Sequence, residues 1–208
     1  VSDQFPELTG RMMIVRKLKP LCIEAIVRGY LAGSAWSDYQ KNQTILGYEL
    51  PAGLSESSRL DHPLFTPTTK AQSGHDIPIS VNKAKELIGH SVLDEVQELS
   101  LNIFEHATKQ LDRCGLILAD TKFEFGLDDD NQIYLIDEVL TPDSSRYWFK
   151  DNYVEGEPQD PVDKQFIRDY LNTIEWDKRP PAPDLPASVI NETLKRYEKA
   201  YQLITSLN

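Results

Sequence analysis

The stretch from Leu116 to Arg146 constrains the fold more than any other part of the chain. It contains two apolar runs on either side of Asp128-Asp129-Asp130-Asn131, a tip made of residue types that favour tight turns. We therefore predict that Leu116 to Leu127 and Gln132 to Leu140 form the two strands of a β-hairpin.

Charged and apolar side chains alternate along the first of these strands. Asp120, Lys122 and Glu124 fall two residues apart, so they project from one face of the sheet. Phe123 and Phe125 project from the other face. The hairpin is thus expected to have an apolar side that packs in a core and a charged side that can bind something.

The pairing register decides what else joins the charged face. With an even number of loop residues, Glu124 lies opposite Leu135 or Asp137, and Asp137 shares its face, whereas a bulge at Gly126 would reverse this parity. Acids gathered on one face supply the oxygen ligands that magnesium prefers. The same pattern fits a solvated face of an antiparallel sheet equally well.

A polar turn follows the second strand. It runs Glu138-Val-Leu-Thr-Pro-Asp-Ser144-Ser145-Arg146 and holds two serine hydroxyls and a guanidinium. These groups make a plausible phosphate cradle.

Another strand is predicted from Cys22 to Tyr30. Alternation places Glu24 and Arg28 on one face, which on its own indicates an ordinary surface ion pair. Gly33 and Ser34 follow in a turn where small residues would let the backbone approach a ligand.

The remaining segments are assigned from breakers and periodicity. Residues 38–80 are rich in proline and are expected to be mostly loop, with Lys70 as a candidate ligand and His75 as a solvated side chain. Helices are predicted from Ser80 to Gly89, from Ser91 to about Arg113, from about Val162 to Ile174 and from about Ala187 to Leu207.

Composition excludes several classes of function. A net charge of -11 argues against nucleic acid or an anionic membrane as a partner, and no apolar run is long enough to span a bilayer. Cys22 and Cys114 lie far apart, without a CxxC pattern, and are expected to be reduced core thiols of a cytoplasmic protein.

Three blocks of sequence occur in the order of a known family. The blocks are EAIVRGYLAGSAW, DTKFEFG and IDEVLTPDSSR, and together with their surroundings they cover nearly the whole chain. The chain resembles the phosphoribosylaminoimidazole-succinocarboxamide synthase (SAICAR synthetase) family. No single short motif would be as specific as three blocks in order.

The resemblance implies an α+β fold, an antiparallel sheet with flanking helices, as the larger lobe of a two-lobed ATP-binding enzyme of the kinase or ATP-grasp kind. Residues 1–19 would be the end of an N-terminal nucleotide-binding lobe with its hinge, including a strand-like segment from Arg11. Residues 20–208 would be the substrate- and metal-binding lobe. The family's glycine-rich phosphate loop has no counterpart here, which indicates a fragment or a reset numbering.

The reaction implied by the resemblance is amide formation in purine biosynthesis. ATP would phosphorylate the carboxylate of carboxyaminoimidazole ribonucleotide, and the amine of L-aspartate would displace the phosphate, with Mg²⁺ on the nucleotide. The partners would be these small molecules only, and the protein a monomer or small homo-oligomer.

The resemblance also assigns roles to individual residues. Lys122 and Asp120 would be catalytic. The substrate would be bound by Glu24, Arg28, Ser34, Ser145 and Arg146. The nucleotide would be bound by Arg16, Lys17, Leu18, Lys70, Glu124 and Asp137. Metal would be held by Glu124, Asp137, Asp120 and Glu24.

Two other functions remain open from the sequence. A small polyol kinase on a related lobed fold could use the same acidic strand pair, although it would need no aspartate. A non-catalytic fragment that keeps the scaffold without turnover is the second alternative.

Overall fold

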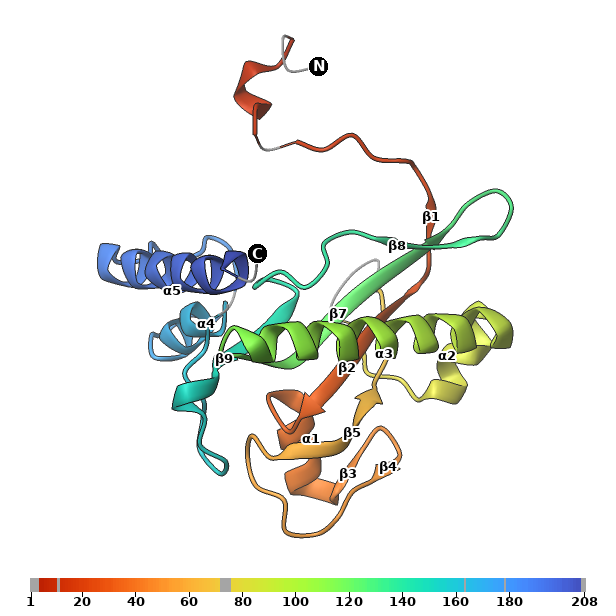
Figure 1. Cartoon of the computed structure of the whole chain (residues 1–208), viewed down its shortest axis with the longest axis horizontal. Helices are drawn as coiled ribbons and strands as arrows, with labels where there is room; N and C mark the ends of the chain where they lie inside the picture. The colour runs from red at the N-terminus through yellow and green to blue at the C-terminus, as the bar shows by residue number, and fades with distance from the viewer. Residues whose placement is uncertain (1–3, 11, 72–75, 163, 178, 207–208) are drawn as a thin grey trace.

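A central antiparallel sheet of seven strands organises the molecule (Figure 1). The structure is a computed structural model that describes residues 4–10, 12–71, 76–162, 164–177 and 179–206. The strands of this sheet are β1 (Lys19–Pro20), β2 (Ile23–Tyr30), β5 (Arg59–Phe65), β6 (Thr68–Thr69), β7 (Leu116–Leu127), β8 (Ile133–Ile136) and β9 (Ser145–Phe149). Helices cover one side of it, which confirms the predicted α+β class.

Strand β7 is the spine of the sheet, because it pairs with four other strands. On one side its first half pairs with β2 and its second half with β1, and on the other side it pairs with β9 and then β8. Most of the sheet is therefore attached to β7, which is the first strand of the predicted hairpin.

A β-bulge in β7 changes which side chains face the core. Leu118 pairs with Tyr147 and Asp120 with Arg146, so Ala119 is an extra residue between the two pairs. Leu118 consequently points into the core while Asp120 points to the opposite face. The bulge lies here and not at Gly126, where pairing with Pro20 and Tyr134 is regular.

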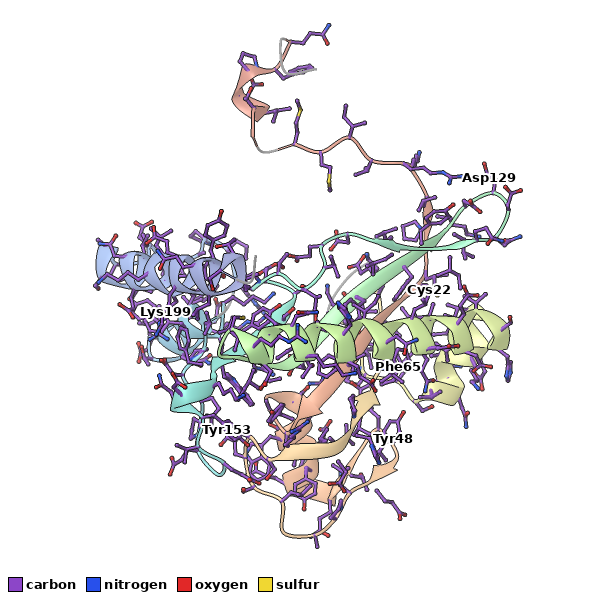
Figure 2. All side chains as sticks on the ribbon, in the orientation of Figure 1. Cys22, Tyr48, Phe65, Asp129, Tyr153 and Lys199 are labelled. Atoms are coloured by element: carbon purple, nitrogen blue, oxygen red, sulfur yellow. The ribbon has the colours of Figure 1, made fainter. Side chains whose placement is uncertain are left out.

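The predicted register of the hairpin is wrong by one residue. Glu124 pairs with Ile136, because the turn between Asp128 and Gln132 has an odd number of residues and Asn131 adopts a left-handed φ of 60°. The second strand also ends at Ile136, since Asp137 has a φ of 62°. Figure 2 labels Asp129 at this hairpin tip, where it projects from the body of the molecule.

Two helices cover the apolar face of the sheet. They are α2 (Val81–Ile88), capped by the Ser80 hydroxyl as predicted, and α3 (His90–Arg113), which starts after Gly89 and not at Ser91. The largest hydrophobic cluster joins this helix to the sheet, through Leu93, Val96 and Phe104 on α3 and Phe123 and Phe125 on β7. The apolar stripe predicted for the long helix is therefore core.

The segment expected to be loop contains a small second cluster. It is built from α1 (Ser34–Asn42), β3 (Thr44–Ile45) and β4 (Tyr48–Glu49), followed by β5. Pro63 lies inside β5, and β5 is an outer strand beyond β2, a position where proline is tolerated. His75 lies outside the described residues.

The two ends of the chain leave the sheet differently. After η1 (Pro6–Leu8), residues 12–18 form no regular strand, and Met13, Ile14 and Val15 are exposed, so the strand-like segment predicted there shortens to β1. Beyond η2 (Lys150–Asn152), α4 (Gln165–Asn172) and α5 (Ala187–Thr205) pack beside β9, where the Lys199 ammonium lies 3.9 Å from the centre of the Phe149 ring.

Two smaller expectations concern the cysteines and membranes. Both cysteines are free, and Cys114 is buried as predicted, but Cys22 is exposed and is not a core thiol. In the described part of the chain, no helix is long and apolar enough to cross a membrane.

Candidate functional site

The face of the sheet opposite α3 gathers polar side chains from β2, β7 and β9. Arg28 pairs with Asp120, and Asp120 pairs with Arg146 on its other side, so these three side chains lie in a row across the sheet. Residues directly opposite one another in antiparallel strands share a face. The charged faces predicted separately for two strands are therefore one continuous surface.

Two guanidinium groups converge on one carboxylate in this row, which we call the arginine cluster (Arg28, Asp120, Arg146 and Ser34). Asp120 forms an ion pair with Arg146 and lies 3.7 Å from Nη1 of Arg28. Nη2 of Arg28 donates to the Ser34 hydroxyl at 3.2 Å, at the first turn of α1. One negative charge set against two positive ones leaves the cluster with a net positive charge that suits an anion.

Gly33 makes room for the cluster. It has a φ of 55°, a left-handed value that favours glycine, and a Cβ placed there would lie 2.8 Å from Nη2 of Arg146. The guanidinium therefore packs directly against the backbone that opens α1. The sequence indicated a close backbone approach at this glycine, and the structure shows that the approaching group is Arg146.

Burial shapes the electrostatics of Arg28. Loss of solvent lowers the pKa of its guanidinium, the nearby Asp120 carboxylate raises it in part, and the positive Arg146 lowers it again. A guanidinium starts from so high a pKa that it remains charged at neutral pH. A buried charge of this kind gains from a bound anion that replaces the lost water.

A second group, the lysine cluster (Lys70, Lys122, Glu24 and Glu124), lies further along the same face. The Lys122 ammonium donates to Glu24 at 2.7 Å and to Glu124 at 3.4 Å, and Glu124 also pairs with Lys70. Burial alone would lower the pKa of Lys122, but Glu24 and Glu124 outweigh it and the net shift is upward. Both acids are mostly buried and each is compensated by an ammonium.

Two of the predicted site residues lie apart from these clusters. The Ser145 side chain is on the opposite face of β9 from Arg146, where its hydroxyl lies 2.8 Å from that of Thr121. Asp137 is exposed in the turn after β8, one residue beyond the partner of Glu124. Within the described residues, neither contacts the arginine cluster.

The predicted hinge residues pack against the hairpin. Arg16 donates to the Tyr134 hydroxyl at 3.0 Å and to Asp128 at 3.1 Å. Leu18 lies against Gly126, where a Cβ would be 3.3 Å from that of Leu18. Lys17 is exposed between these two anchored residues.

The sequence reasoning missed two threonines beside the clusters. The Thr66 hydroxyl accepts from Nε of Arg28 at 2.9 Å, and the Thr68 hydroxyl donates to Glu24 at 3.1 Å. Thr68 lies in β6, but Thr66 lies in the connection before it, so strand alternation does not link the two. Pro67 stands between them, and a proline at that position indicates a loop in the sequence.

The predicted metal ligands provide separate carboxylates and not a ready-made cage. Across the described ranges, no three His, Cys, Asp or Glu side chains are grouped so that they could hold a metal. Magnesium on a nucleotide needs only one or two protein carboxylates, since phosphates and water complete its coordination. Among the predicted ligands, Glu124 is paired with Lys70 and Lys122, Asp120 is paired with two guanidinium groups, and Asp137 is exposed.

A cavity of about 680 Å³ lies on the other side of the sheet, between α3 and the ends of β2 and β7. Phe104, Leu116 and Leu118 contribute to its walls, and neither the arginine cluster nor the lysine cluster does. The chemistry indicated by the sequence is thus on the open face and not in this cavity.

Comparison with known proteins identifies the family of the chain. Residues 1–183 match the family model for SAICAR synthetase. The phosphoribosylaminoimidazole-succinocarboxamide synthase of Thermodesulfovibrio yellowstonii is 50% identical, covering 99% of this chain and 73% of its own length. That of Desulfosudis oleivorans is 51% identical, covering 95% of this chain and 67% of its own length.

Solved structures give the same result. The SAICAR synthase of Saccharomyces cerevisiae, in complex with SAICAR, superposes with a TM-score of 0.83 at 42% identity. This match covers 92% of the chain but 62% of the yeast protein, so the chain spans less than two thirds of it. A SAICAR synthetase in complex with ADP superposes with a TM-score of 0.66 at 26% identity, covering 92% of this chain and 66% of its own. The chain therefore belongs to the SAICAR synthetase family, whose members are ATP-dependent carbon–nitrogen ligases of purine biosynthesis.

Proposed function

We propose that this chain binds carboxyaminoimidazole ribonucleotide across the open sheet face and takes part in joining its carboxylate to the amine of L-aspartate. The observation that carries the proposal is the placement of two charged clusters on one face. Arg28 and Glu24 are four residues apart on β2, which places their Cα atoms about 13 Å apart at ~3.3 Å per residue. A ribonucleotide carries its phosphate and its base at opposite ends and can bridge such a separation.

The arginine cluster would hold the ribose phosphate. Planar guanidinium groups bind phosphate through paired hydrogen bonds, and Ser34 at the start of α1 adds a hydroxyl and the positive end of a helix dipole. Asp120 would orient both arginines, because its Oδ2 atom accepts from Arg146 and forms an ion pair with Arg28.

The lysine cluster would meet the carboxylate end. A carboxylate accepts an amine only after one of its oxygens becomes part of a leaving group. In the first step its oxygen attacks the γ-phosphorus of ATP and ADP departs. In the second step the aspartate amine attacks the acyl carbon, inorganic phosphate leaves and the amine loses a proton. The Lys122 ammonium, held by Glu24, would stabilise the negative charge on the acyl oxygens.

Magnesium would be held on the nucleotide by Glu124 and Asp137, where it would neutralise charge on the phosphates. Lys70, which pairs with Glu124, would lie near the nucleotide phosphates. The adenine would be bordered by Arg16, Lys17 and Leu18. The yeast enzyme bound to SAICAR and the relative bound to ADP support both ligand classes. The monomeric or small oligomeric state and the cytoplasmic location remain predictions.

An omission experiment with the protein at its full natural length tests the reaction. ADP should form only when ATP, Mg²⁺ and the imidazole nucleotide are all present, and amide should require L-aspartate as well. Amide formed without ATP would exclude the acyl phosphate. ADP formed from a polyol would favour a kinase, and no turnover with all components would favour a non-catalytic scaffold.

Lys122→Met and Lys150→Met form a matched pair of variants for this assay. Both remove an ammonium that is paired with an acid, but Lys150 pairs with Asp112 near the end of α3, away from the open face. Loss of a positioned charge at a reacting centre typically costs ~10²-fold or more in kcat. We expect that loss for Lys122→Met and near wild-type turnover for Lys150→Met.

A further inference from the structure

Thr66 lies behind the arginine cluster, in the connection between β5 and β6. Its side chain is 1% exposed, so substrate cannot reach it. Its hydroxyl donates to the carbonyl oxygen of Ile26 at 3.4 Å and accepts from Nε of Arg28 at 2.9 Å. Its backbone N–H donates to the same carbonyl at 2.8 Å, which fixes the residue beside β2.

The contact at Nε determines how the Arg28 guanidinium is turned. Rotation about the bonds of a long arginine side chain is free unless its donors are held, and freezing such a side chain costs entropy. With Nε held by Thr66 and Nη2 by Ser34, the plane of the guanidinium is fixed before any ligand arrives. The remaining N–H donors on the two terminal nitrogens then lie in one fixed plane when an anion arrives, with Nη1 also in an ion pair with Asp120.

We infer that Thr66 is a positioning residue that pre-orients Arg28 toward the phosphate of the nucleotide substrate. This inference rests on the proposed phosphate site. Without the hydroxyl, Arg28 keeps its charge but loses the contact that selects one orientation. The entropy cost of ordering its side chain then arises when the ligand binds, and the affinity for the ligand is lower. The effect should therefore concern the phosphate group and not the rest of the ligand.

The test compares two ligands, SAICAR and its riboside without the phosphate, by calorimetric titration. The dissociation constant of the riboside divided by that of SAICAR measures what the phosphate contributes to binding. In Thr66→Val, which keeps shape but removes the hydroxyl, we expect this ratio to fall about tenfold, with riboside affinity unchanged. Thr66→Ser should restore the ratio, because it returns the acceptor.

Thr193→Val is the matched control. Thr193 is also a buried threonine whose hydroxyl bonds a carbonyl, that of Val189 in α5, and it contacts no site residue. It should lose stability without any change in the ratio. If Thr66→Val does not fold, Thr66→Ala also removes the hydroxyl and allows the same ratio to be measured, and a faster exchange of the Arg28 Nε–H by NMR in Thr66→Ala than in the wild type would report the lost contact.

The possible results distinguish a failure of the role of Thr66 from a failure of the proposed phosphate site. An unchanged ratio in Thr66→Val, beside a reduced ratio in Arg28→Lys, would overturn the role of Thr66 alone. An unchanged ratio in Arg28→Lys would overturn the phosphate site itself. Equal weakening of both ligands by Thr66→Val would show a general structural effect and would also contradict the inference.

Discussion

Arg146 combines two features that a lysine could not reproduce. Its guanidinium pairs with Asp120 and packs closely against Gly33, so its shape and its charge are both used. A compact ammonium cannot supply two parallel hydrogen bonds to a phosphate.

We expect Arg146→Lys to weaken binding of the imidazole nucleotide by about tenfold or more, since hydrogen bonds to charged groups are worth about 1.5–3 kcal/mol. ATP affinity should remain near the wild-type value. Separate titrations with SAICAR and with ATP measure both. A loss of affinity for ATP alone would show that Arg146 binds the nucleotide triphosphate and not the imidazole nucleotide.

Gly33→Ala tests the close approach of Arg146. The left-handed φ of 55° costs a residue with a Cβ roughly 1–2 kcal/mol, and the new methyl group would displace Arg146. We expect a lower midpoint of thermal unfolding together with weaker SAICAR binding. Gly53→Ala, at a φ of 87° with open space around it, should show the stability loss alone.

Lys122 predicts a pH dependence of stability. Its pKa is raised in the folded state, so its contribution is fully present below the unfolded pKa of about 10.4 and is lost as pH rises through the higher folded value. The stability difference between wild type and Lys122→Met should therefore be constant near neutral pH and should shrink in strongly alkaline solution. Urea unfolding across that range measures it, and a difference that grows with pH would contradict the assigned ion pairs.

At the scale of elements, the bulge at Ala119 allows β7 to serve the core and the site at once. Leu118 and Asp120 are two residues apart and would share a face in a regular strand, yet one packs in the core and the other joins the arginine cluster. In a regular strand of the same sequence, with Ala119 paired in the ladder, both side chains would share one face and one of them would point the wrong way.

Deletion of Ala119 should remove the bulge without exchanging faces, because Leu118 and Asp120 would become adjacent and adjacent strand residues point to opposite faces. The midpoint of thermal unfolding should still fall, because the buried contacts of Ala119 with Ala32 and Trp148 are lost. Deletion of Ala52, which is exposed in a loop, serves as the control and should be tolerated. Circular dichroism during thermal unfolding compares the two. A folded protein lacking Ala119, with an unchanged melting midpoint, would show that the bulge is dispensable.

The strands and their faces could be predicted from sequence, while their register could not. Alternation in β2 and β7 correctly identified both charged faces, since period-two patterning is a local property. The partner of Glu124 depended on the number of residues in one turn, which sequence parity left undecided. The strand β5 was missed because Pro63 indicates a break unless the strand is known to lie at an outer position.

The sequence predicted which residues gather at the site but not which of their side chains pair with one another. Arg28, Ser34 and Arg146 were expected together and the structure brings them together. The pairing of Asp120 with both arginines, and of Lys70 with Glu124, depends on side chains that meet across strands distant in sequence. No local pattern could have assigned Asp120 to the arginines in preference to a metal.

At the scale of the whole molecule, the site opposes the overall charge. The chain carries a net charge of -11, yet an anionic nucleotide is proposed to bind where two guanidinium groups exceed one carboxylate. Short-range pairing must therefore outweigh a repulsive long-range field, which salt screens beyond about 10 Å. This arrangement places the selectivity for the nucleotide in the arginine cluster itself.

The most direct measurement of the central claim is a crystal structure of the protein with SAICAR bound. We expect the phosphate oxygens within about 2.7–3.2 Å of the guanidinium nitrogens of Arg28 and Arg146, with the imidazole end directed toward Lys122 and Glu24. A nucleotide bound instead in the cavity beside α3, or held with its phosphate against Lys70 and its imidazole toward the arginines, would contradict it.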